Sequence, residues 1–312
     1  MIDRRDRRLS LVLGLNAVVV AGSVVFGLAA GSLGLLADAG HNLADVAAVV
    51  ASLAALRIAR RAPNERRSFG YHRGTVLAAQ ANAAGLLAVT AVILYEGVRR
   101  LLHPQPVEGG VVLAVAGAAF AANAASVLLL RPDRADLNMR SALLHMAGDA
   151  AASLGVAVAG AIILVTGRFW RLDPMVSIGI ALLVAWQAWK LFRATGDVLL
   201  ESTPAGVDTE ELASAMRGVA GVEDVHDLHV WSLSSDVHAL SAHVVLLGHP
   251  SLEEAQAVGT RVKAAVSGAF GVAHATLELE CEGCVDDGSW CAMDALCSGA
   301  TPPATTSRGG EG

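Results

Sequence analysis

The hydrophobic and polar positions of this chain form two regions with different patterns. Up to about residue 200, long apolar runs alternate with short polar or basic breaks, and beyond it short apolar stretches alternate with polar residues. A helix needs about 20 apolar residues to cross a hydrocarbon core about 30 Å thick. The runs that meet this length are 9–30, 33–56, 75–98, 109–130, 141–166 and 174–193. The pattern therefore predicts a six-helix membrane domain over 9–202, preceded by a short segment, 1–8.

The composition supports a membrane protein. Hydrophobic residues make up 54% of the chain and charged residues 17%, and the mean hydropathy is +0.52, which is too apolar for an ordinary soluble domain. Many apolar residues are small, which favours close packing of membrane helices. The formal net charge of −6 argues against nucleic acid as a partner. The first apolar run is longer than the core of a signal peptide, so we interpret it as a spanning helix.

The distribution of basic residues predicts the orientation. Cytoplasmic loops of membrane proteins carry an excess of Lys and Arg. One side carries the arginines of 1–8, of the loop 57–73 and of 131–140, together with Lys190 and Arg193. The other side carries only Arg99, Arg100, Arg168 and Arg171. We therefore expect both termini in the cytoplasm of a multi-pass protein of the plasma or inner membrane.

Residues 203–280 have the pattern of a small soluble α+β domain. Asp208 and Ser251 each stand three residues before a glutamate, a spacing typical of a helix N-terminus. The stretches 222–233, 237–247 and 274–280 are rich in β-forming residues. The resulting order, αββαβ, favours a ferredoxin-like fold. The remaining segment, 281–312, contains all four cysteines and is predicted to be largely disordered.

Two H-x-x-x-D motifs give the strongest chemical signal. His41 and Asp45 lie in the second apolar run, and His145 and Asp149 lie in the fifth. The four-residue spacing places each pair on one face of a helix. Ionisable groups inside a membrane face the bundle interior and mark ion pathways or partners. Because the two helices run antiparallel, the four residues can meet.

Two imidazoles and two carboxylates form a tetrahedral ligand set that suits Zn²⁺. The alternatives are a purely structural pair of His–Asp hydrogen bonds and a membrane metallo-enzyme. No H-E-x-x-H pattern or hydroxyl nucleophile accompanies the motifs, so we expect no enzymatic activity.

Asp38 is an accessory candidate on the same face. It precedes Asp45 by seven residues, about 10 Å along a helix, and would lie nearer the outer surface. It is either a waypoint for the leaving ion or a solvated residue at the outer mouth.

These motifs resemble the cation diffusion facilitator family in its zinc-exporting branch. The similar stretches are SLGLLADAGHNLADV (32–46), RRSFGYHR (66–73), HMAGDAAASLGV (145–156), VHDLHVWSL (225–233) and SAHVVL (241–246). The resemblance implies a homodimer that exchanges Zn²⁺ for protons through the quartet His41, Asp45, His145 and Asp149. A broader Zn/Cd/Co/Ni exporter and a non-conducting membrane metal sensor are the alternatives.

The resemblance also implies regulatory zinc in the soluble domain, held by His226, His243 and Glu280. His274 is a further candidate ligand there. Cys281 and Cys284 form a C-x-x-C pair that can hold zinc with two thiolates, or remain free thiols in a flexible tail.

Some members of the family carry another metal site in the loop between the second and third spans. The corresponding positions here hold Asn64, Arg67 and Tyr71, so that site is expected to be lost.

Overall fold

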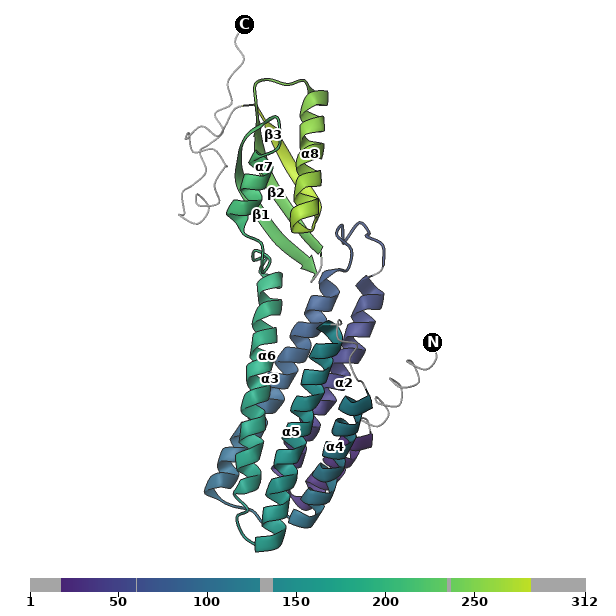
Figure 1. Cartoon of the computed structure of the whole chain (residues 1–312), viewed down its shortest axis with the longest axis vertical. Helices are drawn as coiled ribbons and strands as arrows, with labels where there is room; N and C mark the ends of the chain where they lie inside the picture. The colour runs from purple at the N-terminus through teal and green to yellow at the C-terminus, as the bar shows by residue number, and fades with distance from the viewer. Residues whose placement is uncertain (1–17, 60, 130–136, 235–236, 282–312) are drawn as a thin grey trace. The chain divides into compact units, whose positions relative to one another are not determined.

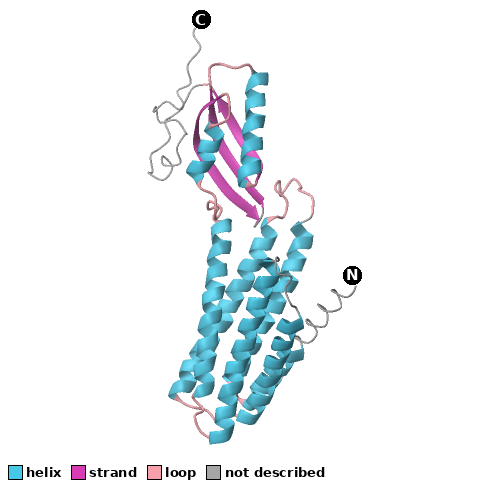
Figure 2. Cartoon of the chain, in the orientation of Figure 1, coloured by secondary structure: helices cyan, strands magenta, loops and turns pink. Residues whose placement is uncertain are grey.

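The computed structural model describes residues 18–59, 61–129, 137–234 and 237–281. It divides into two compact units, each described here separately. The helical unit comprises Met1–Ala62 and Leu77–Thr195, and the second unit comprises Pro63–Val76 and Gly196–Gly312. Figure 1 labels the elements, and Figure 2 shows that the strands lie together in one small sheet.

Long helices build the first unit. A helical segment, Val18–Ala30, is followed by α2 (Leu33–Ala59), α3 (Arg73–Leu102), α4 (Gly109–Leu129), α5 (Leu137–Thr166) and α6 (Leu172–Leu199). Within the described residues, four helices are long and apolar enough to cross a membrane, and Val18–Ala30 and Gly109–Ala125 are shorter apolar helices. A helical transmembrane domain is therefore confirmed, whereas the number of six spans stays a prediction.

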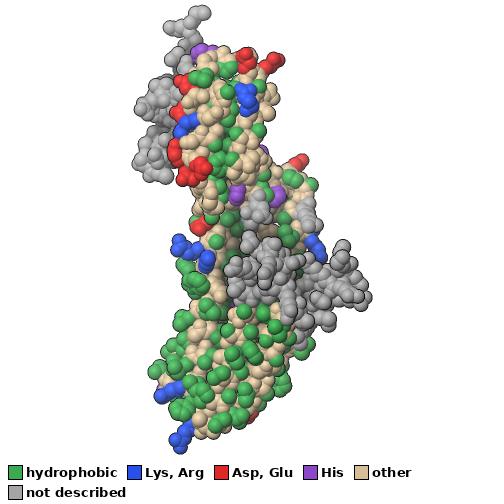
Figure 3. Space-filling model, viewed as in Figure 1, with side chains coloured by type: hydrophobic (Ala, Val, Ile, Leu, Met, Phe, Trp, Pro, Cys, Tyr) green, Lys and Arg blue, Asp and Glu red, His purple; other side chains and the backbone are tan. Residues whose placement is uncertain are grey.

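The surface of the helical unit is apolar, as expected for contact with lipid. Figure 3 shows hydrophobic side chains spread over its visible face, with few charged ones among them. Val165 is 85% exposed and Tyr95 is 73% exposed, which would be unfavourable in water.

Glycines allow α4 and α5 to approach each other closely. A Cβ atom on Gly160 of α5 would lie 2.8 Å from the backbone nitrogen of Leu113 in α4 and 2.9 Å from a methyl group of Val112. These distances are shorter than van der Waals contact, so only glycine fits there. Small residues allow this kind of backbone contact between membrane helices.

The second unit has the predicted αββαβ order. It contains α7 (Thr209–Arg217), β1 (Val222–Ser234), β2 (Val237–Leu246), α8 (Leu252–Phe270) and β3 (Val272–Glu280). The strand order is β1-β2-β3, with β1 antiparallel and β3 parallel to β2. The small sheet is confirmed, and the ferredoxin-like classification stays a prediction.

Local signals in the sequence explain where the helices of this unit begin and end. Asp208 accepts hydrogen bonds from the first turn of α7, and Ser251 and Glu254 form a reciprocal capping box at α8. Gly271 ends α8 with φ of 66°, a conformation that glycine adopts without strain. The core between the helices and the sheet contains Leu212, Met216, Leu240, Val244, Val262 and Val266.

The close contact at Gly160 yields a stability test. Gly160→Ala should destabilise the α4–α5 pair by roughly 1–3 kcal/mol, because the new methyl group overlaps backbone atoms. Gly117→Ala in α4 is the matched control, since a Cβ atom there has no neighbour within 4 Å. Thermal unfolding of the detergent-solubilised protein should show a lower midpoint for the first variant alone. Equal midpoints for the two variants would contradict the packing described.

Candidate metal sites

Helices α2 and α5 bring one residue of each H-x-x-x-D motif together. His41 Nε2 lies 3.3 Å from Asp149 Oδ1, and both side chains are 11% exposed. Each group is a polar side chain on an otherwise apolar helix, so each needs a partner inside the unit. The sequence predicts two contacts between the motifs, His41 with Asp149 and Asp45 with His145. The described side chains include the first of these two contacts.

A second contact joins the same helices one turn away. The hydroxyl of Ser153 in α5 lies 3.3 Å from both carboxylate oxygens of Asp38 in α2. Asp38 is 2% exposed and Ser153 is fully buried, which argues against a solvated Asp38. Asp38 and His41 therefore line the same interface, as their spacing predicts.

The other two predicted ligands lie further along these helices. Asp45 follows His41 by one turn of α2, and His145 precedes Asp149 by one turn of α5. Their side chains are outside the described residues.

In the second unit, strand pairing assembles a compact cluster of ligand atoms. His226 in β1 pairs directly with His243 in β2, and Glu280 in β3 pairs with Val245, two residues after His243. Side chains two residues apart share a face of a sheet. Ligand atoms of His226, His243 and Glu280 consequently lie within 4.8 Å of one another, the one such group of three among the described residues.

Glu280 bridges the two histidines of this triad. One carboxylate oxygen lies 2.9 Å from His226 Nε2, and the other lies 2.8 Å from His243 Nδ1. The three side chains are 20–23% exposed, so an ion from solution can reach them. Two imidazoles and a carboxylate are a common zinc ligand set, and small side-chain shifts would bring the three ligand atoms to about 2 Å from one ion.

Asp227 adds a carboxylate that the strand pattern does not predict. Strict alternation would place it on the opposite face from His226. A register shift between His226 and His229 interrupts the β1–β2 pairing, and Asp227 has φ of 49°. Its carboxylate lies 3.0 Å from His229 Nε2 and 3.6 Å from His243 Nε2.

Carboxylates therefore surround His243, and nearby basic charge is neutralised. Glu278 lies 3.4 Å from His243 Nε2. Arg217 is paired with Asp224 and Glu210 at 3.0 and 3.1 Å. The Val225 amide and Arg217 lower the pKa of Asp224, which keeps it ionised. The local potential thus favours a cation.

The remaining candidates of the soluble domain lie apart from the triad. The ring of His274 packs edge-on against Phe69, with 5.4 Å between ring centroids, and contributes no ligand atom to the triad. Cys281 is an exposed free thiol. Cys284 lies outside the described residues.

In the loop between α2 and α3, the side chains of Asn64 and Arg67 both contact Tyr71. Asn64 donates a hydrogen bond to the Tyr71 hydroxyl at 3.4 Å, and the guanidinium of Arg67 lies over the Tyr71 ring at 4.5 Å from its centroid. The loss of a metal site in this loop stays a prediction.

Comparisons with known proteins agree on one family. The profile of the cation efflux transmembrane domain matches residues 9–200, and the profile of the cation efflux protein cytoplasmic domain matches residues 204–282. The chain is 37% identical over 286 residues to the zinc transporter ZitB of Escherichia coli, which covers 90% of each protein.

Two further relatives have names that refer to the efflux or antiport of metal ions. The metal cation efflux system protein CzcD of Cupriavidus metallidurans is 35% identical, covering 89% of this chain and 88% of the relative. The cadmium, cobalt and zinc/H(+)-K(+) antiporter of Bacillus subtilis is 30% identical, covering 87% and 89% respectively.

The geometry of the triad predicts a zinc site whose binding is lost when its ligands are substituted. The double substitution His243→Ala and Glu280→Ala should abolish one class of sites in zinc titration calorimetry of the full chain, because it deletes two of three ligands. His249→Ala, at an exposed histidine of the same domain, is the control and should leave the isotherm unchanged. An unchanged isotherm for the double variant would exclude the triad as a zinc site.

Proposed function

The chain belongs to the cation efflux, or cation diffusion facilitator, family in its zinc-exporting branch, and on this basis we propose that it exports Zn²⁺ from the cytoplasm in exchange for protons. Members of this family are transporters and not enzymes. The observation that carries the proposal is the contact between His41 and Asp149 inside the apolar helical unit.

The register of α2 against α5 supports a four-residue transport site. Asp38 faces Ser153 and His41 faces Asp149, so three residues forward in α2 correspond to four residues backward in α5. This is the register of antiparallel helices. The next turn in the same register pairs Asp45 with His145. We therefore propose that His41, Asp45, His145 and Asp149 bind one ion between the two helices.

The ligand chemistry accounts for exchange with protons. Zinc binds imidazole and carboxylate in their deprotonated forms, so loading the site releases protons. Without the ion, protons would neutralise the carboxylates of the site, since an uncompensated charge in the membrane is costly. The site consequently holds either metal or protons, which is the requirement for antiport.

We assign the remaining architecture from the sequence pattern and the family. The domain 9–202 would contain six spans in the inner membrane, with both termini in the cytoplasm and the arginine-rich loops facing anionic lipid. The domain 203–280 would adopt a ferredoxin-like fold and join two copies of the chain in a homodimer. The described αββαβ order and the name of the matching domain family support this assignment.

The triad in the second unit would serve regulation. It contains a separate ligand set, His226, His243 and Glu280, in a solvent-accessible position. Zinc bound there would alter transport only through different affinities for two conformations of the protein. Cys281 and Cys284 would add a second, independent zinc site in the tail.

The name of one relative favours a wider range of metals as a second candidate. The antiporter of Bacillus subtilis is named for cadmium and cobalt besides zinc, so the chain would be a broad exporter of divalent ions. The non-conducting sensor remains the alternative outside transport. Flux of zinc, cadmium, cobalt and nickel in proteoliposomes, with a pH dye inside, distinguishes these functions.

Substitution of the described pair tests the transport site. Asp149→Ala or His41→Ala should reduce zinc-driven proton flux by at least about 100-fold, because each removes one of four ligands. Asp197→Ala and His103→Ala are the controls, since both residues are exposed. Near wild-type flux in Asp149→Ala or His41→Ala, at equal reconstitution, would refute the assignment.

A second substitution tests selectivity. His41→Asp converts the ligand set to one nitrogen and three oxygens, and oxygen ligands suit harder or larger ions better than imidazole does. The ratio of zinc to cadmium transport should fall by about tenfold in competition flux assays. A ratio equal to that of the wild type would show that His41 does not set selectivity.

A further inference from the structure

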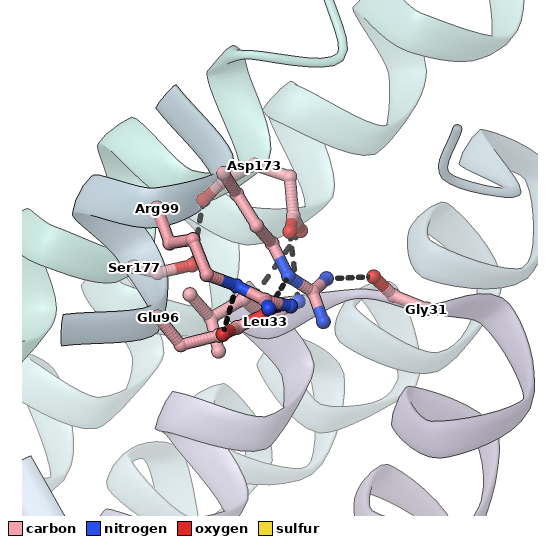
Figure 4. A network of polar contacts seen from close by, with 8 residues as sticks. Gly31, Leu33, Glu96, Arg99, Asp173 and Ser177 are labelled. Carbon is pink, nitrogen blue, oxygen red and sulfur yellow. Dashed lines mark hydrogen bonds and ion pairs between the residues drawn. The ribbon is translucent and has the colours of Figure 1, made fainter. Parts of the chain in front are cut away.

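A buried carboxylate of α6 caps the first turn of α2. Asp173, the second residue of α6, is 2% exposed. Its Oδ2 accepts a hydrogen bond from the Leu33 amide at 2.7 Å, and its Oδ1 accepts from the Ser32 hydroxyl at 2.5 Å and from the Gly34 amide at 3.2 Å. Figure 4 shows this carboxylate lying against the start of α2.

Ser32 completes the cap. Its oxygen accepts a hydrogen bond from the Leu35 amide at 3.2 Å while its hydroxyl proton is donated to Asp173. The first amides of a helix have no partners within the helix, and here three of them are satisfied. The N-termini of α2 and α6 both direct partial positive charge at the same carboxylate. Asp173 is therefore held in place from two helices.

A third helix joins at the turn before α2. Arg100 of α3 donates hydrogen bonds to the Gly31 carbonyl and, at 2.8 Å, to Glu96. Glu96 also pairs with Arg99 at 2.9 Å, as Figure 4 shows. The start of α2 is thus attached to both α3 and α6.

The cap is connected to the proposed transport site through the α2–α5 interface. A Cβ atom at Gly34 would lie 3.0 Å from the Asp173 carboxylate and 3.3 Å from a Val156 methyl group in α5. The following turns bring Asp38 to Ser153 and His41 to Asp149. His41 is eight residues from the first capped amide, about 12 Å along the helix. Because a helix resists compression along its axis, the position of its first turn sets the depth of His41.

We propose that Asp173 is a positioning residue for the ion site. By fixing the first turn of α2, it keeps His41 level with Asp149, and it acts through α2 without touching the ion. This proposal rests on the transport site assigned above. The two H-x-x-x-D motifs lie in α2 and α5, and none of the stretches that resemble the family includes Asp173.

The test separates positioning from a contribution to folding alone. Asp173→Asn removes the charge and replaces one acceptor oxygen with a donor that faces other donors. Asp197→Asn makes the same change at an exposed position of the same helix. Zinc uptake into proteoliposomes is measured at several zinc concentrations to give KM and the maximal rate. Loss of folded protein lowers the maximal rate alone, whereas displaced ligands change KM.

We expect Asp173→Asn to raise KM for zinc by about tenfold, with Asp197→Asn at the wild-type value. Ser32→Ala should give a smaller increase, and Ser32→Thr, which keeps the hydroxyl, should restore the wild-type KM. If Asp173→Asn does not fold, the comparison of Ser32→Ala with Ser32→Thr tests the positioning role instead. A wild-type KM in both Asp173→Asn and Ser32→Ala, or in Ser32→Ala alone if the former does not fold, would overturn the proposal.

The same experiments distinguish a failure of the proposed export function from a failure of the positioning role of Asp173. If the wild-type protein and Asp149→Ala show the same absence of flux, the chain is not a zinc exporter. In that case zinc titration of the detergent-solubilised protein measures the affinity of the binding component that is lost in Asp149→Ala. A weaker component in Asp173→Asn than in Asp197→Asn supports positioning. Equal affinities, or no component that Asp149→Ala removes, would refute it.

Discussion

Polar side chains between α2 and α5 must satisfy one another, because hydrocarbon offers no partner for a hydrogen bond. This requirement determines how the two helices meet. A shift of one residue along α2 would rotate its side chains by about 100°, and it would separate Asp38 from Ser153 and His41 from Asp149. The interface is thus specified by a few polar contacts within an otherwise uniform apolar surface. The same contacts place a ring nitrogen of His41 3.3 Å from a carboxylate oxygen of Asp149, as the proposed transport site requires.

The rest of the helical unit holds this interface in place. Close contact at Gly160 sets α5 against α4, and hydrogen bonds to Asp173 attach the first turn of α2 to α6. Both devices act on the backbone, which transmits displacement better than a flexible side chain does. The proposed ion site could therefore consist of a few residues on two helices, because α4 and α6 fix the positions of α5 and α2.

Much of this arrangement follows from the sequence, and the exceptions have physical reasons. The apolar runs locate the helices. Helical spacing places Asp38 and His41 on one face of α2, and Asp149 lies on the facing side of α5. The sheet residues His226, His243 and Glu280 meet because strand order and pairing bring them together, which the resemblance anticipates but the strand pattern alone does not. Asp227 escapes prediction because a bulge overrides alternation. Asp173 escapes because it caps a helix distant in sequence, and local patterns indicate caps only for the helix that follows them.

The two candidate metal sites use the same ligand types in different surroundings, and this difference suits them to different tasks. The side chains of His41 and Asp149 are 11% exposed in an apolar unit, whereas those of the triad are 20–23% exposed in a unit with a polar surface. An empty site with bare charges is costly in a membrane but tolerable where water reaches it. If the membrane site is the transport site, as proposed, it would have to exchange one cation for another, which would couple metal and proton movements. A zinc ion at the triad would instead bind and leave with the free zinc concentration, as the proposed regulatory role requires.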